Sequence, residues 1–257
     1  TEERKRPNLR IETEALVQKP TFDGLRCTGL VFRRHGEDVR VRATREVILC
    51  GGAVNSPQIL MLSGIGDANT LRSQGIDVRL HQPNIGRHLQ DHLCVDHIYR
   101  ANIRTLNDEL GPLWGKFRHG LNYVLRRRGP LSLGVNQAGG FVRSRPDLPR
   151  PNMQLYFSPV SYTKTVPGKR ALMSPDPFPG LIMGAQPSRP TSRGHLTLKS
   201  ANPFDAPAIH PNYLSTEHDM AEQLEGMKLI RRIAASPELS EIIEEEIRPG
   251  PGVQSDD

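Results

Sequence analysis

The sequence has 257 residues, of which 36% are hydrophobic and 24% are charged, with a formal net charge of +6. These proportions are typical of a globular chain and exclude general disorder. Three cysteines, none in a Cys-x-x-Cys pair, exclude a disulfide scaffold and a zinc ribbon. The basic residues are scattered and only 5% of residues are aromatic, so nothing indicates a nucleic-acid-binding surface.

The first fifty residues predict strands. Residues 7–17 alternate between apolar and polar positions, which indicates a half-buried strand. Residues 26–34 and 39–43 flank the turn sequence HGED and predict a hairpin. Residues 45–50 (REVILC) form a continuous apolar run of the kind found in a strand buried on both faces.

A glycine-rich stretch, GGAVNSPQILMLSGIG, follows. The predicted strand stops at Gly51-Gly52, Ser56 suits a helix N-cap, and Pro57 suits the first helical position. A strand, a glycine turn and a helix start can turn backbone N–H groups toward an anion. Many such turns bind nothing, so the pattern alone leaves ligand binding open. The uncharged run 47–66 has the length of a membrane span, but its glycines and polar residues indicate two short buried elements.

Residues 67–80 predict a short helix and a turn, and PNIGRHLQDHL follows. His88 and His92 have the spacing of two zinc ligands on a helix. Leu89 stands where the zinc-protease motif needs Glu, and a third ligand is not evident, so we predict no metal site. Asp91 and His92 are instead expected to fix a loop through hydrogen bonds.

From residue 94 onward, apolar segments alternate with Gly- and Pro-rich connections. The segments GGFVRS, NMQLYFSPV, GLIMGAQ and HLTLKS are strand-like and predict a second layer of mostly antiparallel sheet. Residues 217–234 carry apolar side chains at helical spacing and predict an amphipathic helix. A further short helix is expected over residues 237–247.

Several of these segments resemble the glucose–methanol–choline (GMC) oxidoreductases, which are flavin-dependent. Residues 52–66 fit the second sequence motif of that family at every defined position. NIGRHLQDHL resembles the family's G-x-N-L-Q-D-H segment, with His88 where Asn is usual, and SRGHLTLKSANPFDAPAIHPNYL resembles the substrate-side half. The resemblance covers about residues 7–250, and it is strongest to the choline-dehydrogenase-like branch.

The resemblance implies an α/β plus α+β fold. A partial FAD/NAD(P)-binding (Rossmann-like) domain would span residues 1–93. A substrate-binding domain, with an antiparallel sheet covered by helices, would span residues 94–257, and its C-terminal part could return toward the first domain. By the same likeness, FAD would contact the backbone of Val17 and lie close to Gly51, Gly52 and Ala53.

The sequence also departs from the family pattern. The N-terminal G-x-G-x-x-G fingerprint is absent, and so is the segment that carries the catalytic His. We therefore expect an internal fragment of an FAD-dependent alcohol dehydrogenase, inactive by itself, with the catalytic His outside this chain and no catalytic residue assigned. The alternative is a naturally short, non-catalytic binding module with the substrate-domain fold.

The family likeness implies oxidation of a primary alcohol to an aldehyde, with hydride transfer to the flavin. In choline-using members a Glu precedes the A-G-G-F stretch, and here that position is Gln137. A quaternary ammonium requires a carboxylate or an aromatic cage, so neutral Gln137 favours a neutral alcohol. The acceptor stays open between oxygen and a quinone. A cytoplasmic location is expected, and peripheral association with the inner membrane and a homo-oligomer stay open.

Overall fold

The computed structural model describes residues 5–163 and 175–256, and it divides the chain into two compact units. Unit 1 comprises residues 1–90 and 193–213, and unit 2 comprises residues 91–192 and 214–257. Sequence reasoning placed residues 94–257 in one substrate-binding domain, and residues 193–213 of that range belong to unit 1. The functional labels of the two predicted domains remain predictions.

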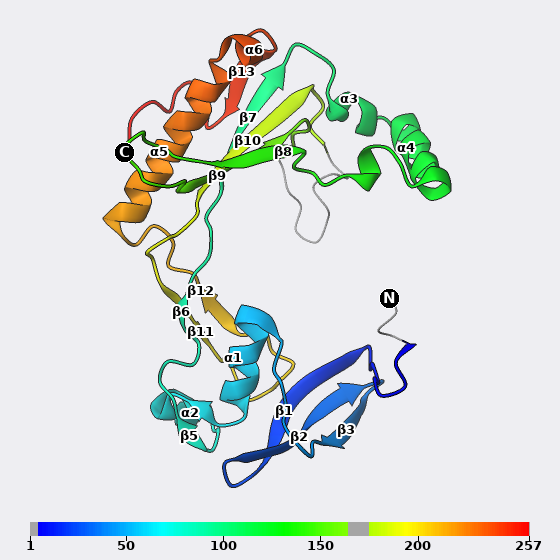
Figure 1. Cartoon of the computed structure of the whole chain (residues 1–257), viewed down its shortest axis with the longest axis vertical. Helices are drawn as coiled ribbons and strands as arrows, with labels where there is room; N and C mark the ends of the chain where they lie inside the picture. The colour runs from blue at the N-terminus through cyan, green and yellow to red at the C-terminus, as the bar shows by residue number, and fades with distance from the viewer. Residues whose placement is uncertain (1–4, 164–174, 257) are drawn as a thin grey trace. The chain divides into compact units, whose positions relative to one another are not determined.

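Unit 1 is built on an antiparallel three-stranded sheet in the order β1-β2-β3 (Figure 1). A parallel pair, β4-β5, and a small sheet in the order β12-β11-β6 complete it. Its elements are β1 (Ala15–Asp23), β2 (Arg26–Arg34), β3 (Glu37–Arg42), α1 (Gly52–Leu62), β4 (Ile65–Gly66), α2 (Ala68–Ser73), β5 (Leu80–His81), β6 (Arg87–Leu89), β11 (Gly194–Thr197) and β12 (Ala208–His210).

Two sequence predictions in unit 1 are confirmed. The hairpin is β2 and β3, and it turns at His35-Gly36, where both residues have positive φ. The short helix after residue 67 is α2, which Asp67 caps by accepting a hydrogen bond from the N–H of Thr70. Leu71 on this helix is 1% exposed and packs with Met61 and Leu198.

Three other predictions in unit 1 are wrong in detail. The first strand begins at Ala15 and not at residue 7, after Glu14 in a left-handed conformation. Residues 45–50 form no strand, and Ile48 is 73% exposed. A strand exists only when a neighbour pairs with its backbone, and no described strand lies beside this run. Helix α1 begins at Gly52 instead of after Ser56, which leaves Pro57 inside the helix.

Unit 2 is built on a five-stranded antiparallel sheet in the order β13-β7-β10-β9-β8, with α5 against one face (Figure 1). Its elements are β7 (Val95–Ala101), α3 (Leu106–Leu110), α4 (Leu113–Arg126), the 3₁₀ helix η2 (Pro130–Ser132), β8 (Ala138–Val142), β9 (Met153–Ser158), β10 (Gly180–Pro187), α5 (Glu217–Ala234), α6 (Pro237–Ser240) and β13 (Ile243–Arg248).

The core of unit 2 lies between α5 and this sheet. Its buried members include Met153, Met183 and Ile230, which are at most 4% exposed. Gly226 lets α5 approach closely, because a Cβ at this position would lie 2.9 Å from the Cε of Met153. The predicted antiparallel sheet covered by a helix is therefore confirmed, and with it the mixed fold class.

Sequence reasoning placed α5 at the residues where the structure has it. It was wrong about residues 237–247, where only one helical turn forms before β13 adds an edge strand to the sheet. It also missed α3 and α4. Thr105 opens α3 with a capping box that includes Asp108, which is a recognisable helix-start signal.

Candidate functional site

The glycine-rich turn of unit 1 forms the start of α1. Gly51 is the N-cap residue and Gly52 has φ +74°, a conformation that favours glycine. The first N–H groups of an α-helix have no intrahelical acceptor, and here no side chain caps them. Gly51, Gly52 and Ala53 are exposed, and a Cβ on Gly52 would meet nothing within 4 Å. The turn therefore offers accessible backbone donors to an acceptor group.

Val17 lies in β1, beside an irregularity in its pairing with β2. Val17 pairs with Phe32 and Lys19 pairs with Val31, so Gln18 is left out of register. Such a bulge leaves main-chain groups of the strand free of the regular ladder. Because α1 packs against β1, Val17 and the glycine turn belong to neighbouring elements of unit 1. Their predicted contact with a cofactor remains a prediction.

The sheet of unit 2 has a polar face opposite α5, which we call the polar sheet face. Strand alternation fixes it, because Met153, Leu155 and Phe157 point toward α5 and the residues between them point away. Cross-strand pairing then puts these residues on the polar sheet face: Asp96, Ile98, Gly139, Phe141, Gln154, Tyr156, Ser158, Ile182, Gly184 and Gln186. Cys94 lies directly before β7 on the same face, beside Gly184.

Amide side chains dominate one end of the polar sheet face. The Nε2 atom of Gln186 lies 3.1 Å from Nδ1 of His92 and 3.1 Å from Oε1 of Gln154, to which it donates. Gln186 is 8% exposed, so its orientation is held by these neighbours. At the other end, Ser158 donates to Oδ1 of Asn136 at 2.7 Å. These groups suit hydrogen bonds to a hydroxyl-bearing ligand.

Asp96 and Cys94 supply the charge and the sulfur of this face. The thiol of Cys94 lies 3.5 Å from Oδ1 of Asp96. Desolvation of the sulfur and the neighbouring carboxylate raise the pKa of Cys94 to about 12. Desolvation and the charge of Asp96 also raise the pKa of Tyr162. The thiol of Cys94 therefore acts as a weak hydrogen-bond donor to Asp96.

Gly184 keeps the centre of the polar sheet face open. A Cβ at Gly184 would lie 2.6 Å from Oδ1 of Asp96 and 2.9 Å from Sγ of Cys94. Any larger residue would displace those two side chains. The glycine thus preserves the space that Asp96 and Cys94 border.

Gln137, the substrate-side candidate, is exposed and lies directly before β8. Its N–H donates to the carbonyl of Phe157 at 2.9 Å, which extends the β8–β9 ladder by one residue. The alternation of β8 puts Gln137 on the same face as Gly139 and Phe141, which is the polar sheet face. Sequence reasoning missed Gln154 and Gln186, although the strands that carry them were recognised. It missed Asp96 together with its strand, β7.

His88 lies in strand β6 and His92 in the segment that follows it, and the described residues hold no metal cluster there. His88 has φ +59° and its Nε2 lies 3.4 Å from Oδ1 of Asn84. Asp91 accepts a hydrogen bond from the N–H of His92, as expected of a residue that fixes a loop. Among the helices that the structure describes, none has the length and apolarity to cross a membrane.

Comparison with known proteins identifies the relatives of this chain. Two sequence models described as GMC oxidoreductase match residues 1–94 and residues 190–257. An oxygen-dependent choline dehydrogenase of Staphylococcus xylosus is 39% identical over 255 residues, which are 98% of this chain and 44% of that protein. The mitochondrial choline dehydrogenase of Homo sapiens is 40% identical over 253 residues, covering 98% and 41%.

An alcohol dehydrogenase (acceptor) of Pseudomonas putida is 40% identical over 258 residues, covering 98% of this chain and 45% of that protein. The chain thus spans less than half the length of these relatives. Among solved structures, pyridoxine 4-oxidase from Mesorhizobium loti has a TM-score of 0.76 at 25% identity, covering 96% and 43%. Formate oxidase from Aspergillus oryzae has a TM-score of 0.83 at 24% identity, covering 97% and 48%, and shares the fold.

The residues present fit part of the cofactor site of such a protein. GMC oxidoreductases bind FAD, and the uncapped start of α1 offers donors with open space in front of Gly52. Family members act on small alcohols with an electron acceptor such as oxygen. The matched segments, together with the motif that contains Gly52, show that this chain belongs to the GMC oxidoreductase family of FAD-dependent oxidoreductases.

Proposed function

We propose that the protein oxidises the CH–OH group of a small primary alcohol to an aldehyde, with FAD as cofactor. The proposal rests on the polar sheet face, whose side chains can form hydrogen bonds with an alcohol. The same chain contains the glycine turn of the family at the start of α1. When bound, FAD supplies the hydride acceptor for this chemistry. The group that takes the hydroxyl proton is expected outside this chain.

Within the chain, we assign two roles. Gly51, Gly52 and Ala53 hold FAD through backbone donors at the start of α1, and Val17 contacts it through the main chain of β1. The amides of Gln154 and Gln186 orient the alcohol on the polar sheet face, since amides donate and accept hydrogen bonds without carrying charge.

The cofactor assignment is tested with Gly52→Ala and with Gly75→Ala as its matched control. Both glycines have positive φ, +74° and +71°, and in both a Cβ would meet nothing within 4 Å. The local strain is therefore the same, and only Gly52 lies at the proposed cofactor site. We expect FAD binding, measured by flavin fluorescence, to weaken about 10- to 100-fold in Gly52→Ala alone. Equal losses in both variants would refute the assignment.

The substrate assignment rests on Gln137, which places an uncharged amide before β8. We propose a neutral primary alcohol. Anaerobic bleaching of the oxidised flavin absorbance of the full-length enzyme, followed with aliphatic alcohols and with choline, measures the preference. A higher kcat/KM for choline than for every neutral primary alcohol would overturn this assignment.

Choline is the second candidate, because Asp96 places a carboxylate on the polar sheet face near Tyr162. If a cation binds there, Asp96→Asn lowers kcat/KM for choline and leaves that for neutral alcohols unchanged. Absence of flavin reduction by any alcohol in the full-length enzyme, with FAD bound, would refute the proposed oxidation and favour the non-catalytic binding module.

Oxygen or a quinone completes the proposed reaction as electron acceptor, and rates under air and with a soluble quinone analogue distinguish the two. We also propose a cytoplasmic protein that associates peripherally with the inner membrane. Homo-oligomer formation belongs to the same proposal, and light scattering over a range of concentrations tests it.

A further inference from the structure

His97 lies in the core of unit 2 with its ring nitrogens unpaired. It is 0% exposed, and no described residue forms a hydrogen bond with either nitrogen. Its ring stacks on that of Tyr99, with the ring centroids 6.3 Å apart, and no described residue bonds the buried hydroxyl of Tyr99 either. Buried polar groups are nearly always hydrogen-bonded, so two exceptions at one place call for an explanation.

Both side chains point toward α5. Tyr99 belongs to the core between α5 and the sheet, and His97 lies two residues earlier on β7, hence on the same face. Strand β10 presents the uncharged Met183 opposite His97. Strand β13 presents Glu246 opposite Tyr99, and α5 presents Arg231 beside it. Among the described residues, Tyr99, Glu246 and Arg231 are therefore the ionisable groups that face His97.

Arg231 and Glu246 together hold the segment that follows β13. The Nε and Nη2 atoms of Arg231 lie 3.0 and 2.7 Å from the two carboxylate oxygens of Glu246. Nη2 also donates to the carbonyls of Gly250 and Val253, at 3.4 and 2.8 Å. The N–H of Gly250 donates to Oε1 of Glu246 at 3.1 Å. The ion pair thus fixes residues 249–253, which we call the latch, to α5.

The latch begins next to His97. Arg248, the last residue of β13, is paired with Ile98, and His97 is the next residue of β7 in that direction. The chain therefore leaves the sheet beside His97. Lys228 on α5 lies 2.7 Å from a carboxylate oxygen of Asp256, but both side chains are more than half exposed. Such a surface pair contributes little, so Arg231 and Glu246 supply the main contacts of the latch.

A proton on His97 is incompatible with the closed latch. Desolvation lowers the pKa of His97, Glu246 raises it and Arg231 lowers it, and the net shift is downward. Both oxygens of Glu246 already accept hydrogen bonds from Arg231, and one of them also accepts from the latch. A charged imidazole would therefore be buried without an acceptor and close to a second cation, which is unfavourable.

We propose that the latch is an acid-sensitive switch, which opens when His97 takes up a proton. Opening separates Arg231 from the carbonyls of the latch, admits water to the imidazole, and leaves Glu246 to pair with the imidazolium. Because the open form takes up the proton at a higher pH, its population should rise by up to about 10-fold per pH unit below the ordinary histidine pKa of about 6.5. This inference concerns unit 2 and does not depend on the proposed function.

Hydrogen–deuterium exchange of the protein at pH 7, 6 and 5 tests the switch. Exchange rates corrected for the pH dependence of the chemical step give the protection of residues 250–256 and of β10 (Gly180–Pro187). We expect residues 250–256 to be less protected than β10 at each pH, because the latch opens without unfolding of the sheet. Their protection should fall about 10-fold between pH 6 and pH 5.

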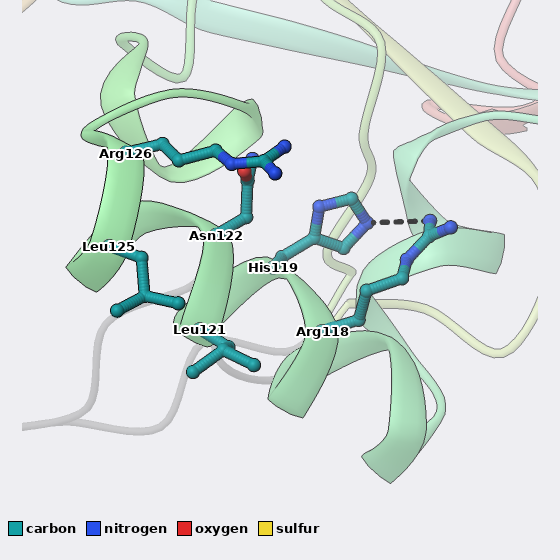
Figure 2. Close-up of a pocket in the computed structure, with 6 residues that line it drawn as sticks. All are labelled: Arg118, His119, Leu121, Asn122, Leu125 and Arg126. Atoms are coloured by element: carbon teal, nitrogen blue, oxygen red, sulfur yellow. Dashed lines mark hydrogen bonds between the residues drawn. The ribbon is translucent and has the colours of Figure 1, made fainter.

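His97→Gln is compared with His119→Gln as its matched control. His119 on α4 is also buried, at 8% exposure, but its Nε2 lies 3.1 Å from a carboxylate oxygen of Glu109 and 3.1 Å from Nη2 of Arg118 (Figure 2). We expect His97→Gln to abolish the pH dependence of exchange in the latch and His119→Gln to retain it. Arg231→Gln should raise exchange in the latch about 10- to 100-fold already at pH 7.

Three results would each overturn the proposal. Equal protection of the latch and β10 would mean that the latch opens only when the whole unit unfolds. Protection of the latch that does not change with pH would exclude a proton-linked opening. A pH dependence that persists in His97→Gln would assign the proton to another group. The first two are measured on the unaltered protein, so they decide the question even where His97→Gln fails to fold.

Discussion

Replacement of Asp219 by Asn should destabilise unit 2 strongly, although the change is nearly isosteric. Asp219 lies in the first turn of α5 and is 3% exposed. Its Oδ1 accepts from the N–H and hydroxyl of Thr191, at 2.7 and 2.8 Å, and its Oδ2 accepts from the N–H of Ser192 at 2.8 Å. One carboxylate thus ties the helix start to the segment after β10.

The expected magnitude follows from these hydrogen bonds. In Asp219→Asn one carboxylate oxygen becomes an NH₂ group, which cannot accept the bond from a backbone N–H. A buried donor left without an acceptor costs about 1–3 kcal/mol, and a bond to a charged acceptor is worth about 1.5–3 kcal/mol. We therefore expect the free energy of unfolding to fall by about 2–4 kcal/mol, a large part of the stability of a typical domain.

The pH dependence of stability gives the same variant a second readout. Burial alone would raise the pKa of Asp219, but its hydrogen bonds from Ser192 and Thr191 hold that pKa well below the ordinary range. Because the folded-state pKa lies below the unfolded value of about 3.9, the stabilisation is present above this pH. It is lost as the pH falls further. Asp219→Asn should therefore reduce the loss of stability between pH 5 and pH 3.

Urea denaturation followed by circular dichroism at pH 7, 5 and 3 measures both effects. Asp256→Asn is the control, because Asp256 is paired with Lys228 on the surface, where both side chains are more than half exposed. Such a pair contributes at most about 1 kcal/mol. A midpoint for Asp219→Asn equal to that of the control at pH 7 would refute the role of the buried carboxylate.

Three further predictions concern the cores of the two units. Burial lowers the pKa of His97, and no described residue forms a hydrogen bond with its ring nitrogens. Because the unfolded chain then takes up a proton at a higher pH than the folded chain, the free energy of unfolding should fall from pH 7 to pH 5. His97→Gln should flatten this pH dependence in thermal melts. Ile230→Ala, at 1% exposure, should cost about 2–5 kcal/mol in urea denaturation, and a cost below 1 kcal/mol would contradict its central position. Gly64→Ala should make the β4–β5 segment susceptible to limited proteolysis, because Gly64 has φ +82° and an added Cβ would lie 2.2 Å from the carbonyl oxygen of Asp77. The control Gly75→Ala, where φ is similar and an added Cβ would meet nothing within 4 Å, should resist cleavage.

Local patterns in the sequence determined several elements. The turn at Gly36 and alternating strands define the hairpin of residues 26–42, and apolar side chains at helical spacing define α5. These features could be predicted because the side-chain period and the turn chemistry lie within one short segment. The strands β8 to β11 were recognisable for the same reason.

Only the tertiary structure decided which neighbours these segments meet. Residues 45–50 have the composition of a buried strand, yet they form none, because a strand needs a paired backbone and not only apolar side chains. The polar sheet face arises from cross-strand register that brings Asp96 and Gln186 to one surface.

Helix α4 shows the difference most clearly. Its apolar spacing can be read from the sequence, but the spacing does not say which side faces the protein. The contacts of His119 and Gly115 turn these two residues toward the protein and leave Trp114 and Phe117 exposed. Periodicity thus fixes how side chains are arranged around a helix, while packing against other elements determines which of its sides is buried.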